Sequence, residues 1–188
     1  MINRRAVSIG ICTVILLIII AFVVGFVTSS PKTPAGNTTL NNVSQNGLVS
    51  YEGDNYTLFY PEGWQQPISA PKADGTGTEL YVSPQSEMTA TMDHVTLDIL
   101  DANKTTLSSA RNTYITYGYP EEDTTVSGVS AERYAKIDPT SDGTYHTIVY
   151  IFQNNESIYL LKLGYKKDSR DTRLERKFNQ MVNAFVLK

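Results

Sequence analysis

The sequence predicts an α+β domain whose central antiparallel sheet lies between helices, preceded by a single transmembrane helix. Residues 6–27 form an uncharged apolar run of the length that a helix needs to cross a bilayer. Beyond this run, six segments are rich in β-branched and aromatic residues, and two segments carry apolar residues at helical spacing. Runs of strands that do not alternate regularly with helices are typical of the α+β class.

The apolar run is predicted to be an uncleaved anchor. Arg4 and Arg5 stand directly before it, and positive residues tend to stay cytoplasmic, so the chain from Thr28 onward should lie outside. The alternative is a cleaved signal peptide, whose apolar region is usually about 7–15 residues long and ends at a small-x-small site. The run is longer than that, and residues 26–30 match such a site poorly. Both interpretations export the rest of the chain.

The exported part is expected to fold by core packing alone. The chain has 16 basic and 19 acidic residues, and setting aside Arg4 and Arg5 leaves 14 basic residues and a net charge of −5. This mildly acidic balance argues against nucleic acid as a partner. The single cysteine, Cys12, lies in the apolar run, so the exported part has no disulfide, thiol nucleophile or thiolate metal site.

Three regions are expected along the chain: a cytoplasmic tip and anchor (1–28), a linker (29–47) and a folded domain (48–188). The linker is rich in Ser, Thr, Asn, Pro and Gly. A segment of this composition stays flexible because it buries too little apolar surface to offset its ordering entropy. Treated as a coil, it reaches roughly 25 Å.

The first half of the domain is expected to be mainly strand. Residues 56–60 alternate and are rich in aromatic side chains, which predicts a strand. Residues 68–78 contain Pro, Gly and Asp and predict a loop, followed by a short strand over 80–82 and a longer one over 89–100. Along the longer strand, two sets of side chains should face opposite sides: Val95, Leu97 and Ile99, and His94, Thr96 and Asp98.

A helix is expected next. Thr105 or Thr106 can cap it, and Gly118 and Pro120 should end it. The spacing i, i+3, i+7, i+8 places four apolar residues on one face: Leu107, Ala110, Tyr114 and Ile115.

The chain after this helix is expected to return to strand. Residues 121–123 are all acidic and predict a solvated loop. Residues 125–137 predict a strand bent at Gly128, and Asp142 and Gly143 predict a turn.

Two strong strands and a helix are expected to close the domain. The strands cover 145–152 and 158–165 and form a hairpin around 153–156; both are apolar on each face, so they should lie centrally. Asp168 or Ser169 should cap the helix, and its apolar stripe should be a core element: Leu174, Phe178, Met181, Val182 and Phe185.

Three stretches, in order, resemble the PsbP-like family. Residues 56–64, YTLFYPEGW, resemble its opening strand, which is closed by Pro-x-Gly-Trp. Residues 126–133, VSGVSAER, resemble its central strand, and residues 178–185, FNQMVNAF, which follow the predicted hairpin, resemble its closing helix. The similarity covers about 48–188 and implies an α/β/α sandwich with a central antiparallel sheet.

The resemblance implies a binding or assembly role rather than catalysis. The family's members are mostly non-catalytic. They include the extrinsic protein of the photosynthetic oxygen-evolving complex, a Ran-binding nuclear-import factor, and many exported bacterial and archaeal proteins. The chain carries an apolar anchor and lacks a transit peptide, so a role in a photosystem is not expected.

No motif in the sequence specifies a reaction or a cofactor. Walker, G-x-S-x-G and G-x-G-x-x-G patterns are absent. His94, with Asp93 and Asp98 nearby, leaves a metal site open, but it and His146 lack recognisable ligand spacing. The residues that suggest a modification are five asparagines in N-x-S/T sequons, which can carry glycans in an exported chain: Asn37, Asn42, Asn55, Asn103 and Asn155.

The expected function is that of a membrane-anchored, extracytoplasmic, non-catalytic binding module whose partner is another membrane or extracytoplasmic protein. No cofactor is expected. Two alternatives remain. A tethered hydrolase would need paired carboxylates in a deep pocket. A carrier of a small ligand or lipid would line a cavity between sheet and helix with aromatic rings, for which the candidates are Tyr114, Tyr117, Tyr119, Tyr150 and Tyr159.

Overall fold

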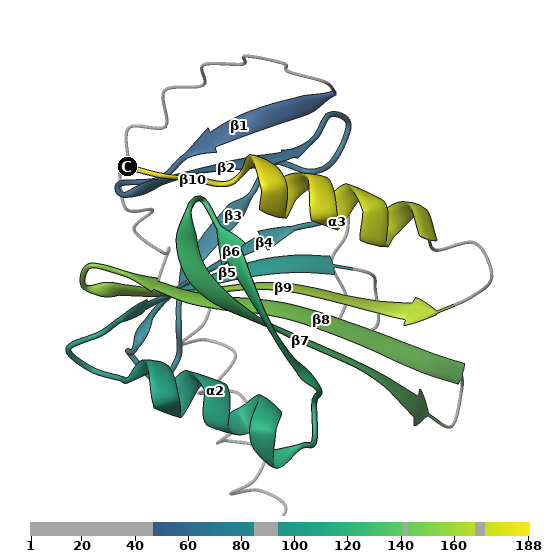
Figure 1. Ribbon diagram of the computed structural model, residues 1–188. Helices are drawn as coiled ribbons and strands as arrows, with labels where there is room; N and C mark the ends of the chain where they lie inside the picture. Colours follow the sequence, from purple (N-terminus) through teal and green to yellow (C-terminus); the bar gives the residue numbers. More distant parts are fainter. Residues whose placement is uncertain (1–46, 85–93, 141–142, 168–171) are drawn as a thin grey trace, which may run out of the picture. The chain divides into compact units, whose positions relative to one another are not determined.

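Strands dominate the computed structural model, which describes residues 47–84, 94–140, 143–167 and 172–188 (Figure 1). The predicted anchor and the predicted linker up to residue 46 lie outside these ranges. No helix within the described ranges is long and apolar enough to span a membrane. The elements in chain order are β1 (Leu48–Glu52), β2 (Tyr56–Pro61), β3 (Ile68–Pro71), β4 (Gly77–Val82), β5 (His94–Asp101), α2 (Leu107–Thr116), β6 (Glu121–Val126), β7 (Val129–Thr140), β8 (Gly143–Asn154), β9 (Ser157–Lys167), α3 (Thr172–Ala184) and β10 (Val186–Leu187).

The described strands form two antiparallel sheets. The larger has seven strands in the order β3-β4-β5-β9-β8-β7-β6, and the smaller has three in the order β1-β2-β10. The hairpin of β8 and β9 lies inside the larger sheet, which confirms its predicted central place. Its side chains are apolar on both faces because both faces of the sheet are covered.

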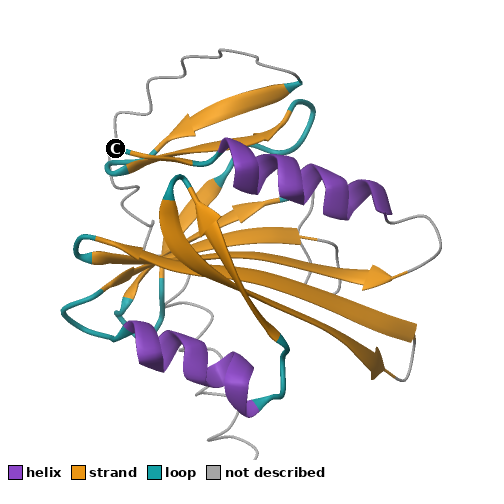
Figure 2. Ribbon diagram, viewed as in Figure 1, coloured by secondary structure: helices purple, strands orange, loops and turns teal. Residues whose placement is uncertain are grey.

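The larger sheet lies between two layers that contain the helices (Figure 2). On one face, α3 and the three-stranded sheet complete a core that includes Phe178, Leu58 and Leu161, all fully buried. On the other face, Tyr114 of α2 packs in a second core with Tyr134. The predicted sandwich of an antiparallel sheet between helices is therefore confirmed, and the small second sheet is an addition to it.

Helix α2 begins where its capping residue predicts. The Thr106 side chain accepts a hydrogen bond from the Ser109 backbone N–H at 3.1 Å, and Gly118 adopts a φ of 70° just beyond the C-terminus. The prediction that Ile115 belongs to the contact face is wrong, because its side chain is 53% exposed. None of the residues of α2, which is described in full, is buried. The contact face is thus narrower than the apolar pattern indicates.

Helix α3 has the apolar stripe that the sequence predicts. Every residue of the predicted stripe is buried, and Phe178 and Met181 are fully so. The helix packs on β2 and β9 and leads directly into β10. The predicted caps, Asp168 and Ser169, lie outside the described residues.

The loop predicted over 68–78 is wrong in part. Its first residues form β3, and β4 already begins at Gly77, so only a short connection separates two paired strands. Strand β3 is an edge strand, exposed at Ile68 and ending in Pro71. Proline is tolerated at an edge because no neighbour needs its missing N–H. Such a strand is hard to predict from the sequence, because its apolar residues do not alternate and it contains a proline.

The single bent strand predicted over 125–137 is also wrong. The chain reverses at Ser127 and Gly128, whose φ angles of 51° and 81° are both left-handed, as a two-residue hairpin requires. Residues 121–123, predicted as a loop, begin the edge strand β6 and remain exposed. Strands β1 and β10 were not expected, and they pair with the two sides of β2.

Candidate functional site

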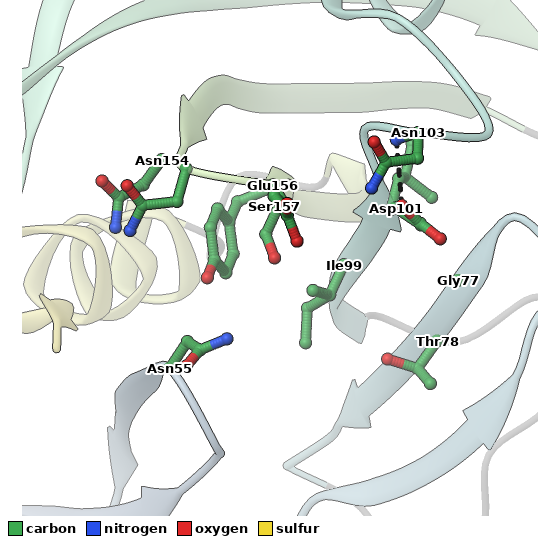
Figure 3. A pocket seen from close by; sticks show the side chains of 12 residues that line it. Asn55, Gly77, Thr78, Ile99, Asp101, Asn103, Asn154, Glu156 and Ser157 are labelled. Carbon is green, nitrogen blue, oxygen red and sulfur yellow. Dashed lines mark hydrogen bonds between the residues drawn. The ribbon is translucent and has the colours of Figure 1, made fainter.

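An open pocket of about 760 Å³ lies where β4 begins and β5 ends. The β8–β9 turn and the loop between β1 and β2 complete its walls. Figure 3 shows Asn55 and Ile99 across the open space from each other, with Asp101 on one side and Asn154 on the other. The lining residues are Asn55, Gly77, Thr78, Ile99, Leu100, Asp101, Asn103, Asn154, Asn155, Glu156, Ser157 and Tyr159.

Three of the five predicted sequon asparagines meet in this pocket. Asn55, Asn103 and Asn155 are exposed and come from three separate connections between elements. Asn37 and Asn42 lie outside the described residues. Sequence reasoning missed Asn154, although it neighbours Asn155 in the predicted hairpin loop. The run of three amide side chains at residues 153–155 is the sequence signal that could have identified it.

The turns that carry these asparagines are held by local hydrogen bonds. The Asn103 backbone N–H donates to Asp101 Oδ1 at 2.9 Å. The Lys188 backbone N–H donates to the Asn55 carbonyl oxygen at 3.1 Å, which ties that loop to the chain after β10. Asn155 adopts a φ of 52°, a left-handed conformation that asparagine tolerates better than most residues. The backbone positions that carry the amides are thereby fixed around the pocket.

The floor of the pocket is less polar than its rim. Ile99 is partly buried, and Leu100 and Tyr159 are buried. The Tyr159 ring stacks on Phe152 with centroids 5.2 Å apart, so its ring belongs to the core. Burial raises the pKa of the Tyr159 hydroxyl, although a hydrogen bond with Ser157 works the other way, so the hydroxyl stays protonated at neutral pH.

The charged groups of the lining are acidic only. Asp101 and Glu156 are the two carboxylates, and none of the described residues that line the pocket is Lys or Arg. Asp101 already accepts the Asn103 backbone N–H, and its other oxygen lies 3.9 Å from Lys104 Nζ. Its contacts are those of a residue that stabilises a turn. The arrangement suits binding through amides more than the paired acid and base that hydrolysis would need.

Gly77 at the edge of the pocket allows β4 to approach β5. A Cβ atom at this position would lie 2.0 Å from the backbone oxygen of Ile99. We expect Gly77→Ala to lower the free energy of unfolding by about 1–3 kcal/mol, because the backbone of one strand must shift to relieve the overlap. Denaturant unfolding measures this loss. The neighbouring exposed residue offers a control: Thr78→Val should change stability by less than about 0.5 kcal/mol. Equal effects of the two substitutions would contradict the close approach.

A second polar cluster surrounds Asp98, whose side chain is 6% exposed. Its Oδ2 accepts hydrogen bonds from Lys72 Nζ and Lys162 Nζ, each at 2.9 Å. Glu79 lies 3.7 Å from Lys162 Nζ and accepts a hydrogen bond from the Tyr81 hydroxyl. That hydrogen bond, together with burial, raises the pKa of Tyr81 to about 12. Every charge in this cluster has an opposite partner, so we assign it to stability.

Among the described residues, the two histidines are not part of a cluster that could hold a metal ion. Within the described ranges, no group of three or more His, Cys, Asp or Glu side chains is arranged to hold a metal ion. Asp98 is bound by two lysines, and Asp93 lies outside the described residues. His146 Nδ1 lies 2.7 Å from the Tyr165 hydroxyl, which donates to Glu175 at 3.2 Å. This chain of hydrogen bonds links β8 and β9 to α3.

The aromatic cavity considered for a lipid or small ligand is not formed. Tyr114 and Tyr119 pack beneath α2, whereas Tyr150 and Tyr159 pack on the opposite face of the sheet. Tyr117 is 67% exposed. The five rings therefore line no common cavity, because α2 and the residues after it cover one face of the sheet while Tyr150 and Tyr159 point to the other.

Solved structures similar to this chain have low sequence identity to it. The cyanobacterial PsbP of Synechocystis sp. PCC 6803 has a TM-score of 0.53 and 15% identity, and the match covers 83% of this chain and 100% of that protein. LpqN of Mycobacterium tuberculosis, involved in cell envelope biogenesis, has a TM-score of 0.45 and 11% identity, with 75% and 89% covered. A Bacteroides thetaiotaomicron protein has a TM-score of 0.48 and 8% identity, with 71% and 45% covered, so this chain spans less than half its length.

No family model and no curated protein matches the sequence. The likeness to the cyanobacterial PsbP shows that the chain has a PsbP-like fold, as the three sequence stretches imply. At this level of identity the likeness concerns the fold alone, because one fold can carry many functions.

Proposed function

We propose that this chain is a membrane-anchored, extracytoplasmic, non-catalytic binding module. The observation that carries the proposal is the pocket. Polar side chains from β4, β5 and three connections between elements converge on it, and amides are the most frequent groups among them. Amide side chains bind by hydrogen bonds and do not exchange protons near neutral pH, so a site built from them suits recognition. The sheet behind them gives the site a rigid support.

The sequence supports placing this module at a membrane. Residues 6–27 are uncharged, and each Leu, Ile, Phe or Val at the centre of such a helix favours insertion by about 0.3–0.6 kcal/mol. Arg4 and Arg5 favour a cytoplasmic N-terminus. A flexible linker over 29–47 would keep the domain near the membrane surface. This tethering would raise the effective concentration of the module toward a partner in or at the same membrane.

This topology gives an expected result. The full-length protein should stay in the membrane pellet after alkaline carbonate extraction. Protease added to intact cells should cut near the linker and release a folded fragment that begins close to Leu48. A mature protein that begins near Ser30 in the soluble fraction would identify residues 6–27 as a signal peptide. A domain that is cut only after lysis would reverse the orientation.

Site-specific photo-crosslinking in native membranes tests the binding role. A photoreactive residue at Glu156, which is exposed at the pocket, should capture a specific neighbour that mass spectrometry can identify. The same group at Gln180, exposed on α3 and outside the pocket lining, is the matched control and should not capture that neighbour. Recovery of no specific neighbour at Glu156 would argue against the proposal.

A further inference from the structure

We infer that the pocket binds a neutral, polyhydroxylated ligand, a sugar unit of a glycan, through the amide side chains of Asn55, Asn103, Asn154 and Asn155. This inference rests on the proposed binding function and names the chemistry of its ligand. It gives Asn55, Asn103 and Asn155 a binding role in place of the glycan-acceptor role that their sequons predict.

The charges at the pocket select against anionic ligands. The described lining contains Asp101 and Glu156 but no cationic side chain. Of the two nearby lysines, Lys188 Nζ lies 2.7 Å from Glu52. Lys104 Nζ donates to the Gly75 carbonyl at 3.2 Å and lies 3.9 Å from the Asp101 carboxylate, whose charge it offsets. Phosphate, sulfate and carboxylate ligands are usually bound by Arg or Lys, which supply charge-assisted hydrogen bonds. The ligand class that remains compatible is neutral.

The hydrogen-bonding groups of the rim match hydroxyl groups. A primary amide offers one oxygen acceptor and two N–H donors, and a sugar hydroxyl both donates and accepts. Neighbouring hydroxyls on a sugar ring can therefore pair with the oxygen and the nitrogen of one amide. Thr78 adds an exposed hydroxyl, and the two carboxylates add acceptors only. A polyhydroxylated ring can satisfy this mixture without carrying any charge.

Size and floor fit the same class. The volume of about 760 Å³ lies within the range of small-molecule sites, which is roughly 300–1,000 Å³. Ile99 provides an apolar contact for the C–H groups of a ring, and Figure 3 shows it across the open space from Asn55. Because the pocket is open, a bound sugar could be one unit of a longer chain that continues into solvent.

The sequons determine how the protein must be produced for the test, because a glycan attached to Asn55, Asn103 or Asn155 would occupy the space of the ligand. The full-length protein is therefore produced in a bacterial host that lacks N-glycosylation and is purified in detergent micelles. Its binding is measured on an array of neutral oligosaccharides of glucose, galactose, mannose and N-acetylglucosamine. Sulfated and uronic-acid oligosaccharides of the same lengths, and neutral peptides, are printed beside them.

The expected result is binding to one or more neutral oligosaccharides, with no binding to the acidic oligosaccharides or the peptides. By titration calorimetry with the best neutral probe, Asn103→Ala should weaken binding about tenfold, the effect of losing one hydrogen bond. Asn155→Gly removes the amide but keeps the left-handed backbone conformation, and it should weaken binding to a similar extent. Asn112→Ala, an exposed site on α2 outside the pocket lining, should leave binding unchanged.

Three outcomes would overturn the inference: no neutral oligosaccharide binds at millimolar concentration, acidic probes or peptides bind instead, or the pocket variants bind as the wild type does. Each of these outcomes is compatible with capture of a specific neighbour by crosslinking at Glu156. Failure of the sugar inference can therefore be distinguished from failure of the proposed binding function. The sugar could come from a glycoprotein or from a free oligosaccharide, and crosslinking in native membranes distinguishes these two sources. If the sugar belongs to a glycoprotein, enzymatic deglycosylation of the membranes before crosslinking should abolish capture of the neighbour at Glu156. If the sugar is a free oligosaccharide, the same treatment should leave that capture unchanged.

Discussion

Phe178→Ala is expected to lower the free energy of unfolding by about 3–5 kcal/mol, the range for truncating a buried aromatic side chain. The Phe178 side chain is fully buried, and its ring lies 5.9 Å from that of Tyr150 between α3 and the sheet. Removal leaves a cavity that the helix cannot fill without moving. The single tryptophan, Trp64, belongs to the same core, so its fluorescence can follow urea unfolding of the full-length chain.

The control for this substitution lies on the same helix. Arg176 is exposed, and Arg176→Ala should change stability by less than about 0.5 kcal/mol. A loss at position 178 as small as that at 176 would contradict the packing. The effect should also reach the pocket, because α3 leads into β10 and the Lys188 N–H donates to the Asn55 carbonyl. Weaker ligand binding is therefore expected in Phe178→Ala at denaturant concentrations that leave the wild type intact.

Asp98→Ala is expected to cost about 3–5 kcal/mol of stability, because it leaves two ammonium groups without their shared carboxylate. Lys72 and Lys162 are only 21% and 24% exposed, so solvent replaces the lost partner poorly. The comparison is Asp138→Ala, which breaks a 2.9 Å pair with Lys136 whose side chains are 39% and 32% exposed. An exposed pair of this kind contributes about 0–1 kcal/mol. Equal losses in the two variants would show that burial does not strengthen the Asp98 cluster.

The pH dependence gives an independent check on this variant. Burial lowers the pKa of Lys72, but its hydrogen bond to Asp98 and the charges of Asp98 and Glu79 outweigh burial and raise it above the usual 10.5. A raised pKa means that the stabilisation is complete below pH 10.5 and is lost as pH rises through the pKa of the folded state. The stability difference between wild type and Asp98→Ala should therefore narrow above pH 10.5. A constant difference would contradict the role of the Lys72 charge.

The elements that the sequence predicts correctly are those that contribute many apolar side chains to the core. The stripe of α3 faces one core, and β8 and β9 send alternate apolar side chains into the cores on the two faces of the sheet. The errors concern edges. Strand β3 and the start of β6 are exposed, so their residues show no alternation and include Pro71. Only pairing with a neighbouring strand, which the local sequence does not encode, makes them strands.

The candidate site could be predicted only in pieces. The sequons identify Asn55, Asn103 and Asn155 one at a time, and their turns are recognisable from composition. Their meeting in one pocket depends on the strand order and on the register that sets Asp101 opposite Ser157. These are properties of the whole fold. The ion cluster at Asp98 escaped prediction for the same reason, because its lysines lie 26 and 64 residues away.

The acidic residues at the start of β6 affect how two copies of the domain can meet. Copies of a protein held in one membrane would collide far more often than copies in free solution, and unpaired sheet edges are the usual places where such collisions turn into aggregates. At one edge of the seven-stranded sheet, Glu121, Glu122 and Asp123 are exposed, so a second copy would bring like charges together. At the opposite edge, Pro71 removes a donor that a growing sheet would need. Both features oppose pairing of this sheet with the sheet of a second copy.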